Sequence, residues 1–129
     1  MNLPEIRTLP IDGEHDYTIP EGTSIETDGK RYTLKQDIKV RWEYREDLFA
    51  GLHFTYQLHS GRNISVNKGC YATPEDLERS ANSLLSKLIS ESDMNLVFEI
   101  RAAPPEEKDN LRAEKKEIDE LFEKTKLAA

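Results

Sequence analysis

The most regular feature of this chain is an alternation of apolar and polar residues that runs from position 38 to position 66. A period of two places one set of side chains on the buried face of a β-sheet and the other set on its exposed face. The apolar set comprises Ile38, Val40, Trp42, Tyr44, Leu52, Phe54, Tyr56 and Leu58. The pattern therefore predicts strands over 38–44, 52–59 and 63–66, with an inner face rich in aromatic residues and a polar outer face.

A two-residue turn predicts a second, shorter hairpin earlier in the chain. The Asp-Gly dipeptide at 28–29 is typical of such turns, because both of their central positions need a positive φ. In the resulting register Ile25 is opposite Tyr32 on one face of the ribbon. Glu26 is opposite Arg31 on the other face, so an apolar pair and an ion pair are kept apart, which supports this register.

The Ser-Gly-Arg sequence at 60–62 predicts a three-residue loop between two of the alternating strands. Such a loop would place Leu58 opposite Ile64. It would also place Tyr56 opposite Val66, so that the apolar residues of both strands share one face.

A helix is predicted from Pro74 to about Ser90. Thr73 can cap its first turn, and Pro74 suits the first helical position. Apolar residues then recur at helical spacing, namely Leu77, Ala81, Leu84, Leu85 and Leu88. A turn at 92–93 and a last strand over 96–100 are predicted to follow this helix.

A second helix is predicted over 106–125, after a break at two consecutive prolines. Its surface is mostly charged and its apolar stripe is narrow. The stripe consists of Leu111, Ile118, Leu121 and Phe122. A helix of this kind docks loosely on its own domain or pairs with a second copy, so these four residues are candidate contacts of a homo-oligomer.

Together these elements predict an α+β fold: a mostly antiparallel sheet of five or six strands, one packed helix and a charged C-terminal helix. The length of 129 residues suits a single globular domain. We divide the chain into an α+β domain over 1–103, which begins with an extended arm over 1–16, and an amphipathic helix over 104–125. Residues 126–129 are typical of a translated cloning site.

Charge and cysteine content narrow the classes of function. The net charge of −7 disfavours direct binding of duplex DNA and suits a protein partner that is basic or binds nucleic acid. The single cysteine, Cys70, forms no intramolecular disulfide, and the first residues lack the basic segment and apolar run of a secretory signal. The sequence therefore predicts a cytoplasmic protein without a membrane-spanning segment.

The chain carries no motif of a known catalytic or cofactor site. It has no glycine-rich phosphate loop and no nucleophile elbow. His53 and His59 would lie about 20 Å apart on an extended strand, which is too far to hold one metal ion. Cys70 is interpreted as a small buried residue. We therefore expect a protein that is not an enzyme and that uses no metal or cofactor.

Cations and amides gather on the outer face of the predicted sheet and in its turns. They are Lys39, Arg41, Arg45, His53, Gln57, His59 and Arg62. Guanidinium groups bind carboxylates and phosphates through paired hydrogen bonds, so one interpretation of this face is a site for a nucleotide-like ligand. The other interpretation is a solvated surface whose cations neutralise nearby acids.

A second candidate surface consists of large apolar residues in or beside the turns, namely Tyr44, Leu48, Phe49 and Tyr71. Exposed aromatic residues often anchor protein interfaces, so these four are candidate contacts with a protein partner. The same residues would equally well close the ends of the sheet.

Part of the first hairpin is similar to a known group of sequences. Ile19-Pro20-Glu21-Gly22-Thr23, followed by Asp28-Gly29 and Tyr32-Thr33-Leu34, resembles hairpins of phage baseplate proteins. The resemblance implies a phage or mobile-element origin and assigns no functional residue.

Small size, acidity and the lack of catalytic motifs favour a protein that acts by binding. Our first hypothesis is an inhibitor or regulator of a protein partner, for example a phage-encoded antagonist of host defence or an immunity protein. The alternative hypothesis is a protein that binds or sequesters a nucleotide-like ligand on the cationic face.

Overall fold

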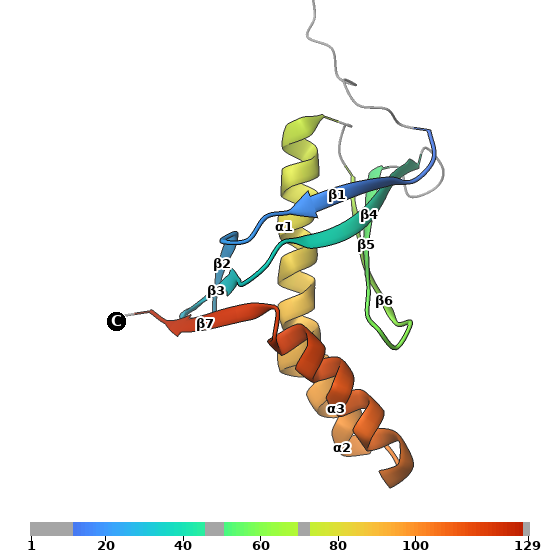
Figure 1. The fold of residues 1–129 in the computed structure, drawn as a ribbon, viewed down its shortest axis with the longest axis vertical. Helices are drawn as coiled ribbons and strands as arrows, with labels where there is room; N and C mark the ends of the chain where they lie inside the picture. The colour runs from blue at the N-terminus through green and yellow to red at the C-terminus, as the bar shows by residue number, and fades with distance from the viewer. Residues whose placement is uncertain (1–11, 46–50, 70–72, 128–129) are drawn as a thin grey trace, which may run out of the picture.

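The computed structural model describes residues 12–45, 51–69 and 73–127, and this part of the chain contains two antiparallel sheets (Figure 1). The first sheet has the order β1 (His15–Ile19), β4 (Ile38–Arg45), β5 (Gly51–Gln57) and β6 (Asn63–Lys68). The second has the order β2 (Ser24–Thr27), β3 (Lys30–Leu34) and β7 (Phe122–Lys126). The predicted α+β class is confirmed, with the strands divided between two sheets instead of one.

The first sheet has the two-sided character that its alternation predicts. Val40, Trp42 and Phe54 are buried, whereas Lys39 and Arg41 are exposed. Trp42 is paired with Phe54 across β4 and β5, and their rings stack with centroids 6.4 Å apart. The buried side of this sheet therefore supplies the aromatic part of the core. Of the predicted arm over 1–16, residues 1–11 lie outside the described residues, while positions 15 and 16 begin β1.

The hairpin between β2 and β3 has the predicted register. Asp28 and Gly29 have φ values of +53° and +74°, as the two-residue turn requires. Ile25 is paired with Tyr32. On the opposite face Nη2 of Arg31 lies 2.7 Å from Oε1 of Glu26.

The register predicted for the turn between β5 and β6 is wrong by two residues. Ile64 is opposite Tyr56 and not opposite Leu58. The backbone N–H of Leu58 donates instead to the carbonyl of Arg62, at 2.8 Å. Gly61 explains the difference, because it has a φ of +98° and favours a three-residue loop that begins one position earlier. Since the shift is an even number of residues, each side chain keeps its predicted face.

Helix α1 (Pro74–Ser90) begins as predicted and contacts β5 and β6 of the first sheet and β2 of the second. The Thr73 hydroxyl accepts a hydrogen bond from the backbone N–H of Asp76, at 3.3 Å. The buried leucines of α1, including Leu84 and Leu88, belong to the same hydrophobic core as the buried residues of both sheets.

The turn predicted at 92–93 and the strand predicted over 96–100 are wrong, because the helix continues. A π-helical turn, η1 (Glu91–Asn95), leads directly into α2 (Leu96–Ala102). Ser92 and Leu96 are buried four residues apart, so the buried side of α1 extends along the helix. In a short apolar run, periodicity alone does not distinguish a helix from a strand, which is why the strand prediction failed here.

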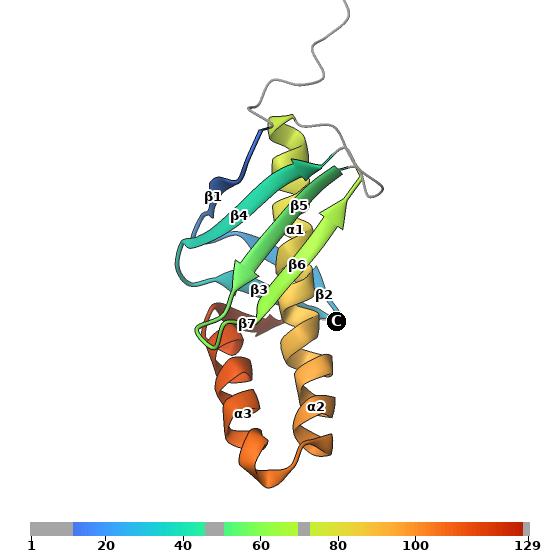
Figure 2. The same ribbon diagram turned by 90° about the vertical axis from the view of Figure 1, so that its right-hand side faces the viewer.

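The helix predicted to end near 125 ends earlier. Helix α3 (Pro105–Asp119) runs back beside α2 and forms a helical hairpin with it (Figure 2). The chain then enters β7, where Phe122 is paired with Leu34 of β3. The core buries Ile118, Leu121 and Phe122, and Leu111 packs partly against it. These four candidate oligomer contacts therefore pack within their own chain.

Candidate functional site

The helical hairpin of α2 and α3 projects away from both sheets (Figures 1 and 2). Its inner side belongs to the core, where Leu96 has 0% of its surface exposed. Phe98 of α2 and Met94 of the preceding turn η1 are 63% and 55% exposed. Within the described residues these two are the large hydrophobic side chains exposed to solvent. We call them the Met94/Phe98 strip.

The local sequence dictates this placement. Ser92 and Leu96 occupy the buried side of a continuous helix. Met94 lies halfway between them and Phe98 lies two residues after Leu96, so both point to the opposite side, because an α-helix turns by about 100° per residue. Met94 and Phe98 are themselves four residues apart, so they lie one turn above the other and form a single apolar contact surface.

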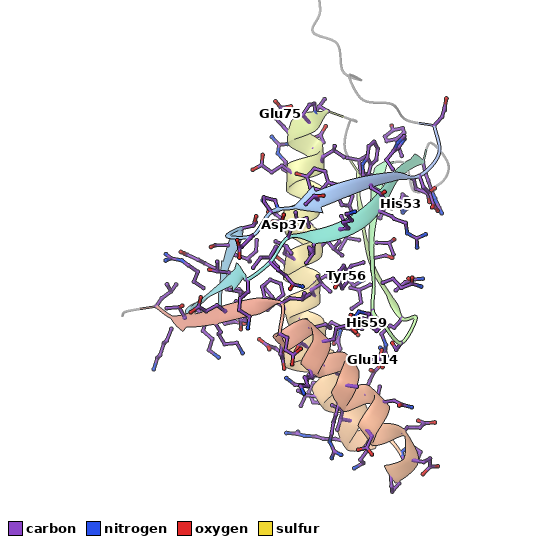
Figure 3. The ribbon with its side chains drawn as sticks, in the orientation of Figure 1. Asp37, His53, Tyr56, His59, Glu75 and Glu114 are labelled. Carbon is purple, nitrogen blue, oxygen red and sulfur yellow. The ribbon has the colours of Figure 1, made fainter. Side chains whose placement is uncertain are left out.

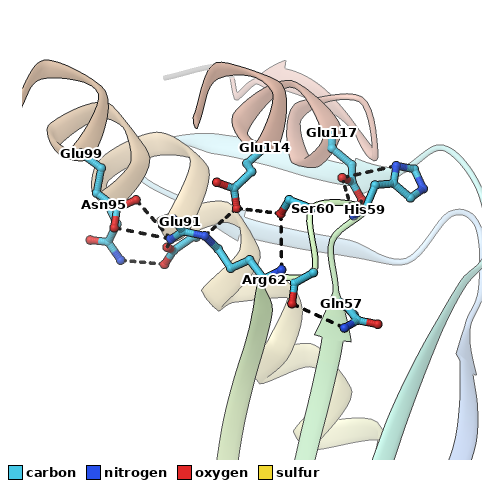
Figure 4. A network of polar contacts seen from close by, with 10 residues as sticks. Gln57, His59, Ser60, Arg62, Glu91, Asn95, Glu99, Glu114 and Glu117 are labelled. Atoms are coloured by element: carbon cyan, nitrogen blue, oxygen red, sulfur yellow. Dashed lines mark hydrogen bonds and ion pairs between the residues drawn. The ribbon is translucent and has the colours of Figure 1, made fainter. Parts of the chain in front are cut away.

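A polar cluster centred on Arg62 holds the turn between β5 and β6 against this hairpin (Figure 4). The guanidinium of Arg62 faces three carboxylates, with N–O distances of 2.6 Å to Glu114, 3.1 Å to Glu99 and 3.4 Å to Glu91. The Ser60 hydroxyl donates a further hydrogen bond to Glu114, at 3.1 Å. The cluster therefore links three segments: the turn, the long helix formed by α1, η1 and α2, and α3.

The electrostatic balance of this cluster favours a charged arginine. Burial lowers the pKa of the Arg62 guanidinium, but the carboxylates of Glu114, Glu99 and Glu91 outweigh burial and raise the pKa above its ordinary value. The side chain of Glu114 is only 8% exposed, so its charge depends on Arg62 for compensation. Arg62 is thus a structural cation that is paired with acids of its own chain.

The same turn and α3 border an open groove of about 890 Å³. The backbone N–H of His59 donates to Oε1 of Glu117 at 3.0 Å, and its ring nitrogen Nδ1 lies 3.5 Å from the same oxygen. The groove is lined by three glutamates, Glu114, Glu117 and Glu120, against two cations, Arg62 and Lys116. Its charge does not suit a phosphate group.

The seven polar residues of the predicted cationic face do not form one surface. His53 lies on β5, whereas His59 lies beyond the end of that strand, beside α3 (Figure 3). Gln57, at the end of β5, donates to the carbonyl of Gly61 at 3.4 Å. Lys39 is exposed on β4. The structure therefore separates the members in the turn from those on the strands.

The arginines that remain on the strands have acidic partners. Arg41 lies 3.5 Å from Glu14, and Arg45 lies 2.6 Å from Glu43. The hollow beside Arg41 and His53 measures about 40 Å³. Ligand pockets usually measure about 300–1,000 Å³, so this hollow is too small to enclose a nucleotide.

Of the predicted partner contacts in the turns, Tyr44 is half-buried at the end of β4 and packs against the core. Leu48, Phe49 and Tyr71 lie outside the described residues, as does Cys70. Their proposed role in an interface stays a prediction.

The Met94/Phe98 strip is the feature that the sequence analysis missed. The signal was present: once 91–102 is drawn as a helix that continues α1, Met94 and Phe98 fall opposite Leu96. The strand predicted over 96–100 concealed it, because alternation would have placed Leu96 and Phe98 on the same face.

Comparisons with known proteins identify no family for this chain. No protein-family model, curated protein or solved structure matches this chain. Across residues 12–45, 51–69 and 73–127, no three histidine, cysteine or acidic side chains are grouped so that they could hold a metal ion. No helix in these same ranges is long and apolar enough to cross a membrane.

Proposed function

We propose that this protein acts by binding a protein partner through the Met94/Phe98 strip. Peptide helices that dock in grooves use apolar anchors at spacings of three and four residues. Met94 and Phe98 have this spacing, are more than half exposed, and lie in η1 and α2, at the base and along one arm of the helical hairpin. Their exposure is the observation that carries the proposal, because a large apolar side chain in water is stabilised by burial in an interface.

The contribution of the strip to binding can be estimated. Full burial of a methionine or phenylalanine side chain is worth about 1.5–3 kcal/mol, and somewhat more than half of each remains to be buried here. The two together would supply roughly 2–3 kcal/mol, or about 30–150-fold in affinity. That is the range of a small interface hot spot.

Charge favours a particular kind of partner. The chain has a net charge of −7, and Glu106 and Glu107 are exposed at the start of α3, near the tip of the hairpin. An apolar groove with a basic rim would complement this surface and would be attracted to it at long range. We therefore propose that the protein inhibits or regulates such a partner by occupying its groove.

The experiment compares two matched double variants. The immobilised wild type is used to capture proteins from an extract of its native cell, and the main captured protein is then purified and titrated by calorimetry. Met94→Ser with Phe98→Ser should weaken this binding at least tenfold, because both anchors are lost. Lys39→Ser with Arg41→Ser alters the exposed face of the first sheet and should leave the affinity within about twofold.

Three outcomes would count against the proposal. Equal capture by both variants would mean that the strip is not the contact. Loss of binding only with the Lys39 and Arg41 pair would favour the cationic face. A doubled mass of the wild type in sedimentation, abolished by the strip variant, would show that the occupant is a second copy of the chain.

A further inference from the structure

A cavity of about 340 Å³ lies where the π-helical turn η1 meets β3, α3 and β7. Its apolar floor is formed by Ile89, Ile118 and Phe122. The rings of Tyr32 and Phe122 meet edge to face with centroids 6.3 Å apart, which gives the cavity an aromatic corner. The volume is at the small end of the range for ligand pockets, so it suits a single ring or a short chain.

Polar groups converge on one side of this cavity. The Tyr32 hydroxyl donates to Oδ2 of Asp93 at 2.6 Å, and the Ser92 hydroxyl donates to Oδ1 of Asp119. The other oxygen of Asp119 lies 2.8 Å from Nζ of Lys115. Burial, assisted by the hydrogen bond to Asp93, raises the pKa of Tyr32 to about 12, so this hydroxyl stays protonated and oriented at neutral pH.

The other oxygen of Asp93 faces a cation of the chain itself. Nζ of Lys124 lies 3.7 Å from Oδ1 of Asp93 and 5.3 Å from the centre of the Tyr32 ring. An ammonium group is therefore placed between a carboxylate and an aromatic face, which is the usual arrangement for recognising amines. At 3.7 Å the ammonium and the carboxylate are not in direct hydrogen-bonding contact.

Lys124 is a weak occupant of this position. It lies on the last strand, its side chain is 46% exposed, and it can turn into solvent. Of the two carboxylates in the lining, Asp119 is already paired with Lys115, whereas Lys124 is the cation beside Asp93, so a ligand cation would take the place of Lys124. A ligand ammonium in place of the lysine would keep the charge balance and let an attached apolar group bury itself on the floor.

We propose that the cavity binds a small primary amine with a flat apolar body, whose ammonium replaces that of Lys124 beside Asp93 and Tyr32. The π-helical turn contributes consecutive residues, Ser92 and Asp93, to one wall, and such turns occur frequently at functional sites. Met94, the next residue, is exposed to solvent, so this site is separate from the Met94/Phe98 strip.

The test uses three probes that share one phenyl group: 2-phenylethylamine, 2-phenylethanol and 3-phenylpropionate. Binding to the full chain is followed by two-dimensional NMR and by the melting temperature, which a ligand of the native state raises. The amine should shift the signals of Asp93 and of the aromatic corner in a saturable manner. It should bind at least tenfold more tightly than the alcohol, and the carboxylate probe should bind least.

Three variants, one of them a control, separate the proposed contact from a general effect. Lys124→Ala removes the internal competitor and should tighten amine binding several-fold, whereas Lys126→Ala on the same strand should change nothing. Asp93→Asn should abolish the preference of the cavity for the amine over the alcohol. Equal binding of amine and alcohol, no binding by either, or weaker amine binding after Lys124→Ala would each overturn the proposal, and the lysine variants keep it testable if Asp93→Asn does not fold.

Discussion

Replacing Arg62 by methionine should destabilise the protein by about 3 kcal/mol at neutral pH. The change keeps most of the apolar stem and removes the one guanidinium that faces Glu91, Glu99 and Glu114. Breaking a buried ion pair costs about 3–5 kcal/mol, because the remaining charge is left without compensation. Glu114 is in that position, since its side chain is 8% exposed.

The estimate lies at the lower end of that range for a structural reason. The side chain of Arg62 is 31% exposed, so water can partly replace it beside the acids. Glu99 is more exposed than Glu114, and exposed pairs contribute about 0–1 kcal/mol. For a domain of this size, a loss of about 3 kcal/mol corresponds to a fall in melting temperature of roughly 10 °C.

Urea unfolding followed by circular dichroism measures this loss, with Arg112→Met as the matched control. Arg112 also has an acidic partner, Asp109, at 3.4 Å, but both side chains lie mostly in water. Its variant should remain within about 0.5 kcal/mol of the wild type. Adding Glu114→Gln to the Arg62 variant should restore part of the lost stability, because it removes the uncompensated buried charge. A loss no larger than that of Arg112→Met, or no recovery of stability on adding Glu114→Gln, would show that the cluster does not hold the turn to the helices.

Three further predictions follow from other parts of the structure. Folding raises the pKa of Tyr32 from 10.0 to about 12, so the neutral hydroxyl stabilises the fold fully below pH 10. This contribution, about 2–3 kcal/mol of unfolding free energy, should be lost as the pH rises to 12. In denaturant titrations, Tyr32→Phe should remove this pH dependence. Leu96→Ala should cost about 2–5 kcal/mol in such titrations, whereas Phe98→Ala should cost less than about 1 kcal/mol, because only Leu96 is fully buried. A chain ended after Ala103 should fail to fold cooperatively by circular dichroism, because it lacks three core residues of 104–127.

Sequence reasoning succeeded where the structural signal is local. In 38–45 apolar and polar residues alternate over most of the strand, and the Asp-Gly turn at 28–29 sets the register of its own hairpin. It failed for β7, whose sequence Phe-Glu-Lys-Thr-Lys has one buried residue and no regular alternation of burial. That segment is a strand because β3 is available to pair with it, and this information lies about 90 residues away in the chain.

The same contrast between local and long-range signals applies to the candidate sites. Arg62 is identifiable from sequence as a cation in a turn, but its three carboxylates come from the long helix and from α3. Its role as a structural cation is therefore a property of the tertiary fold. The Met94/Phe98 strip depends on whether 96–100 is a helix or a strand, and this short, mostly apolar segment, Leu-Val-Phe-Glu-Ile, is compatible with both.

The acidity of the chain has a structural explanation that is independent of any partner. The core contact of the helical hairpin is narrow, since Leu96 and Ile118 are its fully buried apolar residues. Directional contacts supplement them: Arg62 binds Glu99 of α2 and Glu114 of α3, and Tyr32 donates a hydrogen bond to Asp93 in the turn that leads into α2. Ion pairs and hydrogen bonds specify geometry more strictly than apolar contact, which has no preferred direction. Several of the acids that give the protein its negative charge thus fix the angle at which the hairpin leaves the sheets, and that angle determines where the Met94/Phe98 strip is presented.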